Sequence, residues 1–386
     1  MAGEKVAVIG GGISGLCTAL ALQQRGIQAE VYEQGMPEDY PRAGMILGGN
    51  ALICLEMLGL REAVWKNSIG TDCYTIRADS GKVISTLKYS SPVITSCFRF
   101  IYGPLLLTLL ASELSPGTLH FGQKLDNFER NKNSITLFFE GGETKECSYM
   151  LACDGLHSLV RRKLLPDSSP VASGYTCWRG ILDHDGEFSN YAFSETWGHR
   201  GRFGIVPLPN NQIYWYAVRK CEGQEKAMNT WASIDLLFNF FYYHDPIQQI
   251  LERTKDNEII HHDIFESKSP GILFFGCILL LGDAAHSPLL NMGQGASLAI
   301  EDAVTLAASI ASEESTNKGF TQYSKSHARR ARKVSSHIRK FDWIAKMELP
   351  FLCSMRNCFL SLAPSSFHGK RLGDLFDITP WDLSSG

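Results

Sequence analysis

The sequence has no strong excess of either charge and no long apolar run. Its 386 residues include 37 Lys and Arg against 40 Asp and Glu, which gives a formal net charge of −3. Nucleic-acid binding requires a basic surface, so no nucleic-acid partner is expected, and we interpret the short basic stretch at 327–333 as a solvated helix face. The longest apolar run, 271–281, is shorter than the roughly 20 residues that cross a bilayer, so no integral membrane segment is expected.

Targeting and metal-binding signals are also scarce. No charged and then apolar leader precedes Lys5, so we expect a cytoplasmic protein. The cysteines number 11 and include no Cys-x-x-Cys, which favours reduced thiols over a disulfide framework or a zinc site. His261-His262-Asp263 has no partner cluster in the sequence, so no metal is predicted.

What is present is a globular composition, 44% hydrophobic and 20% charged, and an alternation of element types. A strand at 5–10, a helix at 13–25 and a strand at 28–33 predict a βαβ unit, and further helices are predicted at 50–58 and 105–114. The length indicates two domains or one domain with an insertion.

The central part of the chain changes character. Aromatic and β-branched residues recur in short runs that predict antiparallel strands at 175–182, 191–197, 202–208 and 212–218, with a hairpin turn at 209–211. Helical sequence at 224–256, an apolar strand at 272–283 and an apolar helix at about 341–367, packed on the first domain, are expected to follow.

A glycine fingerprint joins the first strand to the first helix. Gly10, Gly12 and Gly15 form G-x-G-x-x-G, with Ile13 and Ser14 between the last two, and Glu33 ends the second strand. Such glycines permit a tight turn, a close approach by a pyrophosphate and close helix packing, while the acid binds a ribose. The pattern predicts a bound dinucleotide but does not choose between FAD and NAD.

A second glycine-rich turn lies late in the chain. Leu281-Gly-Asp283-Ala-Ala-His286 ends a buried strand, and a helix starts at 293–296. An acid at a strand end can bond a polyol such as a ribityl chain, and exposed helix amides can stabilise the negative charge of a reduced flavin. These features favour FAD.

Three stretches, 10–15, Cys153-Asp154-Gly155 through Arg161, and 282–295, together resemble the group A flavoprotein hydroxylases, typified by para-hydroxybenzoate, salicylate and urate hydroxylases. The resemblance spans nearly the whole chain. It implies an α/β fold: a Rossmann-like FAD-binding domain of the glutathione-reductase type, an inserted antiparallel sheet domain for the substrate, and C-terminal helices. The predicted divisions are 1–72, 98–172 and 271–340 for the FAD-binding domain, 73–97 and 173–270 for the substrate domain, and 341–386 for the C-terminal segment.

The resemblance also implies the chemistry. NADPH or NADH would reduce FAD, O2 would add at the flavin C4a, and the hydroperoxide would transfer oxygen to a small aromatic substrate, without a metal. A monomer or homodimer is expected. The FAD contacts implied by the fingerprints and the resemblance are Gly10, Gly12, Ile13, Ser14, Gly15, Glu33, Gln34, Arg42, Ala43, Leu125, Asp154, Asp283, Gly293, Gln294, Gly295 and Ala296.

On the substrate side, Arg202 and Tyr214 resemble substrate-contacting residues of the urate branch, although each could instead pack within the sheet. His286 is interpreted as structural and close to the flavin. An aromatic lining is expected from among Trp178, Phe193, Trp197, Phe203, Tyr214 and Tyr216, although half of any alternating strand faces away from it.

The chain departs from the family pattern at several positions. Tyr102 stands where many relatives have an arginine, and Arg99 is the nearest possible substitute; Asn291 replaces an acid of the urate branch, and the family's usual Trp is missing from 267–277. Alternatives therefore stay open: an amine or amino-acid oxidase, a hydroxylase or epoxidase of a larger polyketide-like or polyene-like substrate, or a flavin-binding protein without turnover. The Asp154-Gly155 and 282–286 stretches favour a hydroxylase over an oxidase.

Overall fold

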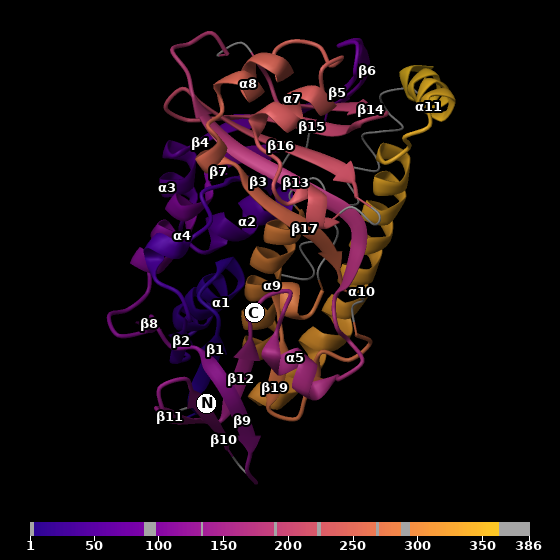
Figure 1. The fold of residues 1–386 in the computed structure, drawn as a ribbon. Helices are drawn as coiled ribbons and strands as arrows, with labels where there is room; N and C mark the ends of the chain where they lie inside the picture. Colours follow the sequence, from indigo (N-terminus) through magenta and orange to yellow (C-terminus); the bar gives the residue numbers. More distant parts are fainter. Residues whose placement is uncertain are drawn as a thin grey trace.

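The computed structural model describes residues 4–88, 98–132, 134–188, 191–221, 225–267, 270–286 and 294–362. Figure 1 shows two main regions, with the N-terminal strands at one end, a large antiparallel sheet at the other, and the long C-terminal helix α10 along one flank. Among the helices of the described residues, none combines the length and hydropathy that crossing a bilayer requires.

The first region is built on a six-stranded sheet with the order β18-β19-β12-β1-β2-β8. Its pairs are parallel except the edge pair β18 and β19. The central strands carry almost only apolar residues and are buried throughout, as expected for a parallel sheet covered on both faces. Its strands are β1 (Val6–Ile9), β2 (Ala29–Tyr32), β8 (Leu119–His120), β12 (Tyr149–Ala152), β18 (Phe274–Phe275) and β19 (Ile278–Leu280).

Helices from both ends of the chain meet in this region. α1 (Ile13–Gln24) packs directly against α9 (Gln294–Ala311), so the two predicted glycine turns open neighbouring helices. The other elements here are α2 (Gly49–Met57), α3 (Arg61–Lys66), α4 (Gly103–Ser112), α5 (Leu159–Leu164), η1 (Pro37–Asp39), η3 (Gly282–Ala284) and the small sheet β9 (Leu125–Arg130), β10 (Ile135–Phe139) and β11 (Thr144–Cys147).

The second region is a seven-stranded sheet with the order β17-β13-β16-β15-β14-β5-β6. All its pairs are antiparallel except β14 with β5. Its strands are β5 (Cys73–Ala78), β6 (Val83–Lys88), β13 (Val171–Asp183), β14 (Ser194–Gly198), β15 (Gly201–Leu208), β16 (Gln212–Lys220) and β17 (Ile260–Glu266). The predicted hairpin turn is confirmed, with Asn210 and Asn211 at φ of 62° and 55°.

Alternation along the strands gives this sheet two different faces. On β16, Tyr214 and Tyr216 face a core shared with the three-stranded sheet β3 (Gly44–Gly48), β7 (Phe98–Tyr102) and β4 (Ser68–Thr71) and with α10. Trp215 faces the opposite core, which is closed by helices of the 225–258 segment. Those elements are α6 (Glu225–Met228), α7 (Ser233–Asn239), α8 (Ile247–Arg253) and η2 (Asp256–Glu258).

Two sequence expectations need correction, and a third is confirmed. The apolar run 272–283 forms a short hairpin because Gly276 has φ +77° and reverses the chain between β18 and β19. The helical segment expected at 224–256 is confirmed from residue 225 onward as α6, α7 and α8, separated by turns. The C-terminal helix does not pack on the first domain: after α10 (Thr316–Ala345), helix α11 (Pro350–Leu362) packs on β6 of the seven-stranded sheet.

Candidate functional site

The first glycine turn is shaped by close contacts that exclude side chains. Gly10 has φ +103°, and a Cβ there would lie 2.4 Å from the Cys153 carbonyl oxygen. A Cβ on Gly15 would lie 1.9 Å from the Gly10 carbonyl oxygen, whereas one on Gly12 would meet nothing within 4 Å. The turn is therefore closed toward the protein and open at Gly12, as close approach of a phosphate to the backbone requires.

Glu33 connects the end of β2 to this turn. One carboxylate oxygen accepts from the Gly11 N–H at 2.5 Å, and the other accepts from the Gly35 N–H at 2.7 Å. Its neighbour Gln34 is exposed. The acid therefore lies beside the glycine turn, where the predicted ribose contact requires it.

The three fingerprint segments meet in space. A Cβ on Gly282 would lie 2.6 Å from Ser14 Oγ, which puts the late turn against the first residues of α1. Arg161 donates to the Ala284 carbonyl at 3.1 Å, and Ser297 Oγ accepts from the Gly48 N–H at 3.0 Å. Segments 10–15, 153–161, 282–286 and 294–297 and the β3–α2 junction thus surround one place.

Several buried polar atoms at this place have no hydrogen-bond partner within the described residues. They are Ser14 Oγ, Asp154 Oδ1 and both side-chain amide atoms of Gln294. An unsatisfied buried polar atom costs roughly 1–3 kcal/mol, so a group of them indicates a site that a polar ligand would satisfy. The donors, acceptors and open glycine turn fit a dinucleotide.

The remaining predicted cofactor contacts have different surroundings. Asp283 lies in η3 and is exposed, although the surrounding protein limits its hydration and raises its pKa. Gln294, Gly295 and Ala296 open α9, while Gly293 and Asn291 lie outside the described residues. Ala43 is buried just before β3, Arg42 beside it is exposed, and Leu125 is buried in the core around the parallel sheet.

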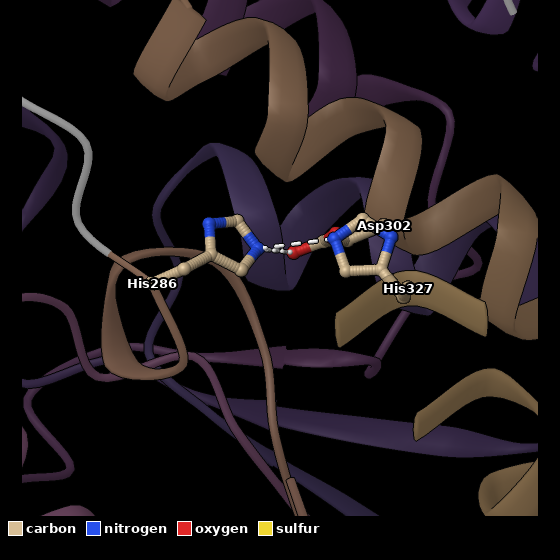
Figure 2. A group of neighbouring side chains, drawn as sticks. All are labelled: His286, Asp302 and His327. Atoms are coloured by element: carbon tan, nitrogen blue, oxygen red, sulfur yellow. Dashed lines mark hydrogen bonds and ion pairs between the residues drawn. The ribbon is translucent and has the colours of Figure 1, made fainter. Parts of the chain in front are cut away.

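A buried group of three side chains lies directly behind the late turn, and Figure 2 shows His286 and His327 approaching the same carboxylate of Asp302. His286 Nε2 lies 2.8 Å from Asp302 Oδ2, which also accepts from the Gly282 N–H at 2.9 Å. His327 Nε2 pairs with Asp302 Oδ1 and lies 3.2 Å from His286 Nε2. We call these three residues the histidine–aspartate cluster; they join α9, α10 and the turn that carries Asp283.

Charges within this cluster are strongly coupled. Burial opposes ionisation of Asp302, but the two imidazoles outweigh it and hold the pKa of the carboxyl well below its usual range. Burial likewise opposes protonation of His286, and the Asp302 carboxylate outweighs it and raises the pKa of that imidazole. One imidazole nitrogen of each histidine and a carboxylate oxygen of Asp302 lie within 4.8 Å of one another, as binding of a divalent cation would need. In this structure these atoms instead form hydrogen bonds with one another.

On the substrate side, the structure brings Tyr214 to the boundary between the two regions. A Cβ on Gly44 would lie 2.5 Å from the Tyr214 ring, so the ring rests on the backbone of β3 beside Ala43. Burial raises the pKa of Tyr214 to about 12, which keeps its hydroxyl protonated at neutral pH. The substrate contact predicted for Tyr214 stays a prediction.

Arg202 belongs to a second buried polar group. Its guanidinium lies 3.2 Å from Glu195 Oε1 and 3.6 Å from Asp342 Oδ1 of α10. Glu195 also accepts from Tyr74 and Tyr216 at 2.8 and 2.7 Å. We call Arg202, Glu195 and Asp342 the arginine cluster; two carboxylates flank the charge that was predicted to face the substrate.

Two residues of the expected aromatic lining lie on the other face of the sheet. Trp178 and Phe203 point to the opposite side of the sheet and are buried in the core under α7 and α8. Phe193, Trp197 and the two tyrosines of β16 share the face toward β3 and β7. The period of two along each strand explains this division, because the sequence did not show which half faces the first region.

The structure also shows where the residues that depart from the family pattern lie. Arg99 donates to Ser68 Oγ at 2.7 Å and to the Trp65 carbonyl at 3.0 Å, so it ties β7 to α3 and β4. The Arg99 side chain therefore bonds to α3 and β4 and does not take the place of Tyr102, which is the N-cap residue of α4. His262 contacts Arg179 at 2.6 Å within the sheet, and burial lowers its pKa to about 3.

Sequence reasoning missed Asp302, His327 and Asp342 as members of buried clusters. Asp302 lies in a helical pattern that signals only amphipathic packing, and its partner His327 lies in the stretch interpreted as a solvated basic face. Only the fold brings these positions together.

Known proteins resemble this chain over nearly its full length. Residues 4–337 match the family described as FAD binding domain. Aurachin C monooxygenase/isomerase of Stigmatella aurantiaca is 30% identical, covering 98% of this chain and 99% of that protein. The 2-heptyl-3-hydroxy-4(1H)-quinolone synthase of Pseudomonas aeruginosa is 28% identical, covering 94% of each chain. Klebsiella pneumoniae HpxO, solved with FAD and uric acid, has the same fold, with a TM-score of 0.87 at 22% identity and coverage of 100% of this chain and 98% of that one.

Proposed function

This chain belongs to the FAD-dependent monooxygenase family, and we propose that it uses NAD(P)H and O2 to hydroxylate an uncharged, apolar aromatic or heteroaromatic substrate. The overall reaction consumes one NAD(P)H, one proton and one O2 for each substrate, and yields NAD(P)⁺, water and a product with one added oxygen atom. Bound FAD supplies the redox chemistry by accepting hydride and activating O2. The protein must hold the flavin, place the substrate ring and exclude water.

The residues that would hold FAD are those where the three fingerprints converge. The open amides at Gly12 suit the pyrophosphate, and Glu33 suits the adenosine ribose. Asp283 would bond the ribityl chain, and the N-terminus of α9 would face the pyrimidine edge, where its dipole favours negative charge.

The observation that carries the proposal is the contact of Tyr214 with Gly44. It joins the aromatic face of the seven-stranded sheet to the segment beside the predicted flavin position, so a ring bound next to this contact would be close to both cofactor and sheet. Tyr214 stays uncharged at neutral pH and can offer a hydroxyl donor.

An uncharged substrate is supported by the arginine cluster. The guanidinium of Arg202 already lies between Glu195 and Asp342, and Lys346 lies 2.6 Å from Asp342. The two cations and two carboxylates of this group offset each other, so Arg202 offers little net positive charge to an anionic substrate. The name of the P. aeruginosa relative's product, an alkylated quinolone, is consistent with such a ligand.

A matched substrate panel tests this function. Purified holoenzyme is supplied with NADPH or NADH and either 2-alkyl-4-quinolones or anionic rings of similar size, such as salicylate and urate. We expect the uncharged rings to stimulate NAD(P)H consumption and to gain about 16 Da, the mass of one oxygen atom. Stimulation by the anions alone would reject the substrate class, and peroxide formation from amines without NAD(P)H would favour an oxidase.

A further inference from the structure

The C-terminal helices form an exposed surface that the cofactor and substrate sites do not use. Figure 1 shows α10 running along one flank of the molecule, with α11 at its end beside β6 and β14. α10 carries eight Lys and Arg but a single acid, Asp342, which is buried and engaged with Arg202 and Lys346. The solvent-facing side of this helix is therefore basic.

The exposed cations of α10 share one face. Lys325, Arg329, Arg332, Lys340 and Trp343 are all exposed and follow the spacing i, i+4, i+7, i+15 and i+18. At 3.6 residues per turn this spacing keeps them on one side of the helix. Trp343, which is 70% exposed, ends the row next to α11.

α11 continues this surface with an apolar face. Phe351 is 73% exposed, Phe359 67% and Leu362 78%, and Leu352 and Met355 lie between them on the same side. The opposite side is anchored, because Arg356 is buried and donates to the Trp197 carbonyl at 3.2 Å. An anchored helix with a row of exposed large apolar side chains marks an interaction surface, not a loose end.

We propose that this face docks the enzyme on the surface of an anionic phospholipid bilayer. A basic helix face next to exposed tryptophan, phenylalanine and leucine matches the two components of interfacial binding, attraction to anionic headgroups and insertion of apolar side chains. The absence of acids from the exposed side of α10 supplies the charge complementarity. A protein partner of mixed charge would not require a row of one sign.

The docking surface lies next to the seven-stranded sheet. α11 packs on β6, and Arg356 contacts the strand that carries Glu195 and Trp197. Docking through α11 would therefore bring the sheet close to the bilayer. This docking surface is formed by residues of α10 and α11, and it does not depend on the hydroxylation proposed above.

Vesicle co-sedimentation of the full-length holoenzyme tests this surface. We expect sedimentation with vesicles of phosphatidylglycerol and phosphatidylcholine, weaker sedimentation with phosphatidylcholine alone, and loss of binding as salt is raised. Equal recovery with and without anionic vesicles would overturn the proposal.

Two paired variants locate the surface. The double variant Arg329→Glu/Lys340→Glu should bind anionic vesicles at least about tenfold more weakly, since each cation near such a surface contributes roughly a factor of five. Its control, Lys66→Glu/Lys132→Glu, makes the same charge change at exposed sites on α3 and at the β9–β10 turn and should bind like wild type. Equal losses in both variants would mean that only net charge matters, which would overturn the assigned face.

A second variant and its control test the exposed apolar side chains of α11. Met355→Ser/Phe359→Ser should also lose at least about tenfold in binding, because two inserted side chains are removed. The control Met57→Ser changes an exposed methionine at the end of α2 and should have no effect. Unchanged vesicle binding in the α11 variant, together with a fall in molecular mass by light scattering, would show that this face holds a second copy of the chain and overturn the proposal.

Discussion

The two buried charge clusters identified among the described residues differ in what can change their charge. The histidine–aspartate cluster lies behind the turn that carries Asp283, and its His286 imidazole, whose pKa the Asp302 carboxylate raises, can gain or lose a proton. The arginine cluster lies in the seven-stranded sheet, and its guanidinium keeps its charge at any pH at which the protein folds. The cofactor side can therefore respond to protonation, whereas the substrate side keeps a fixed balance of charge.

The two clusters also differ in which parts of the fold they hold together. Asp302 accepts from the Gly282 backbone N–H at 2.9 Å, so the first cluster fixes the backbone next to a predicted ribityl contact. Asp342 belongs to α10, so the second cluster fixes the C-terminal helix to the sheet. Breaking the first cluster should release flavin, and breaking the second should loosen the sheet while flavin stays bound.

The largest effect is expected from Asp302→Asn. The substitution removes the only carboxylate of the cluster and leaves two facing imidazoles, at a cost of roughly 3–5 kcal/mol in the free energy of unfolding. Flavin content, measured as the ratio of 450 nm to 280 nm absorbance, should fall sharply. The matched variant Asp342→Asn should keep its flavin; flavin loss in both variants would erase the contrast between the clusters.

Glu195→Gln should have the next largest effect. Arg202 would keep Asp342 but lose its closer carboxylate, and the tyrosines would keep an amide oxygen as acceptor. We expect a loss of about 2–3 kcal/mol in unfolding free energy by denaturant titration. Flavin content should match wild type, and a flavin-free protein would show that the sheet cluster also supports the cofactor.

The pH dependence separates the clusters more finely. The pKa of His286 is raised in the folded protein, so its contribution is complete below its ordinary value of 6.5 and is lost as pH rises through the raised pKa. The pKa of Asp302 is lowered, so its contribution is present above 3.8 and is lost only as pH falls through the lowered pKa. Thermal stability and flavin retention should therefore decline as pH rises through the raised pKa of His286.

His286→Gln provides the control for that pH dependence. This variant should be less stable at pH 6 but should show a flatter alkaline decline, because the titrating group is gone. An identical decline in wild type and variant would assign the titration to another group.

The smallest effect is expected from Tyr214→Phe. The ring would keep its packing on Gly44, so unfolding free energy should change by less than about 1 kcal/mol. Loss of the hydroxyl should raise the KM for the aromatic substrate several-fold, with flavin content unchanged. A KM equal to that of wild type would show that Tyr214 only packs within the sheet.

The parts of the fold that the sequence predicted well are governed by local rules. The βαβ opening and the Asn210-Asn211 turn follow from alternation and from residues that tolerate positive φ. The hairpin at Gly276 was missed because a single glycine inside an apolar run does not show whether the chain continues or reverses.

The candidate site likewise contains features that the sequence predicted and features that it did not. The glycine turn at 10–15 was recognisable because its steric needs are local. The pairing of Asp302 with His327 and of Arg202 with Asp342 depends on helices that approach only in the folded chain. No spacing within the sequence signals such contacts, so the basic stretch around His327 was interpreted as a solvated helix face.

Labelling with ¹⁸O2 traces the inserted oxygen atom from dioxygen to the product. Holoenzyme, NAD(P)H and an uncharged heteroaromatic substrate should give a hydroxylated product that carries one ¹⁸O atom, with NAD(P)H consumption stimulated by the substrate. A product without the label, or stoichiometric peroxide with unmodified substrate throughout the panel, would contradict the proposed function.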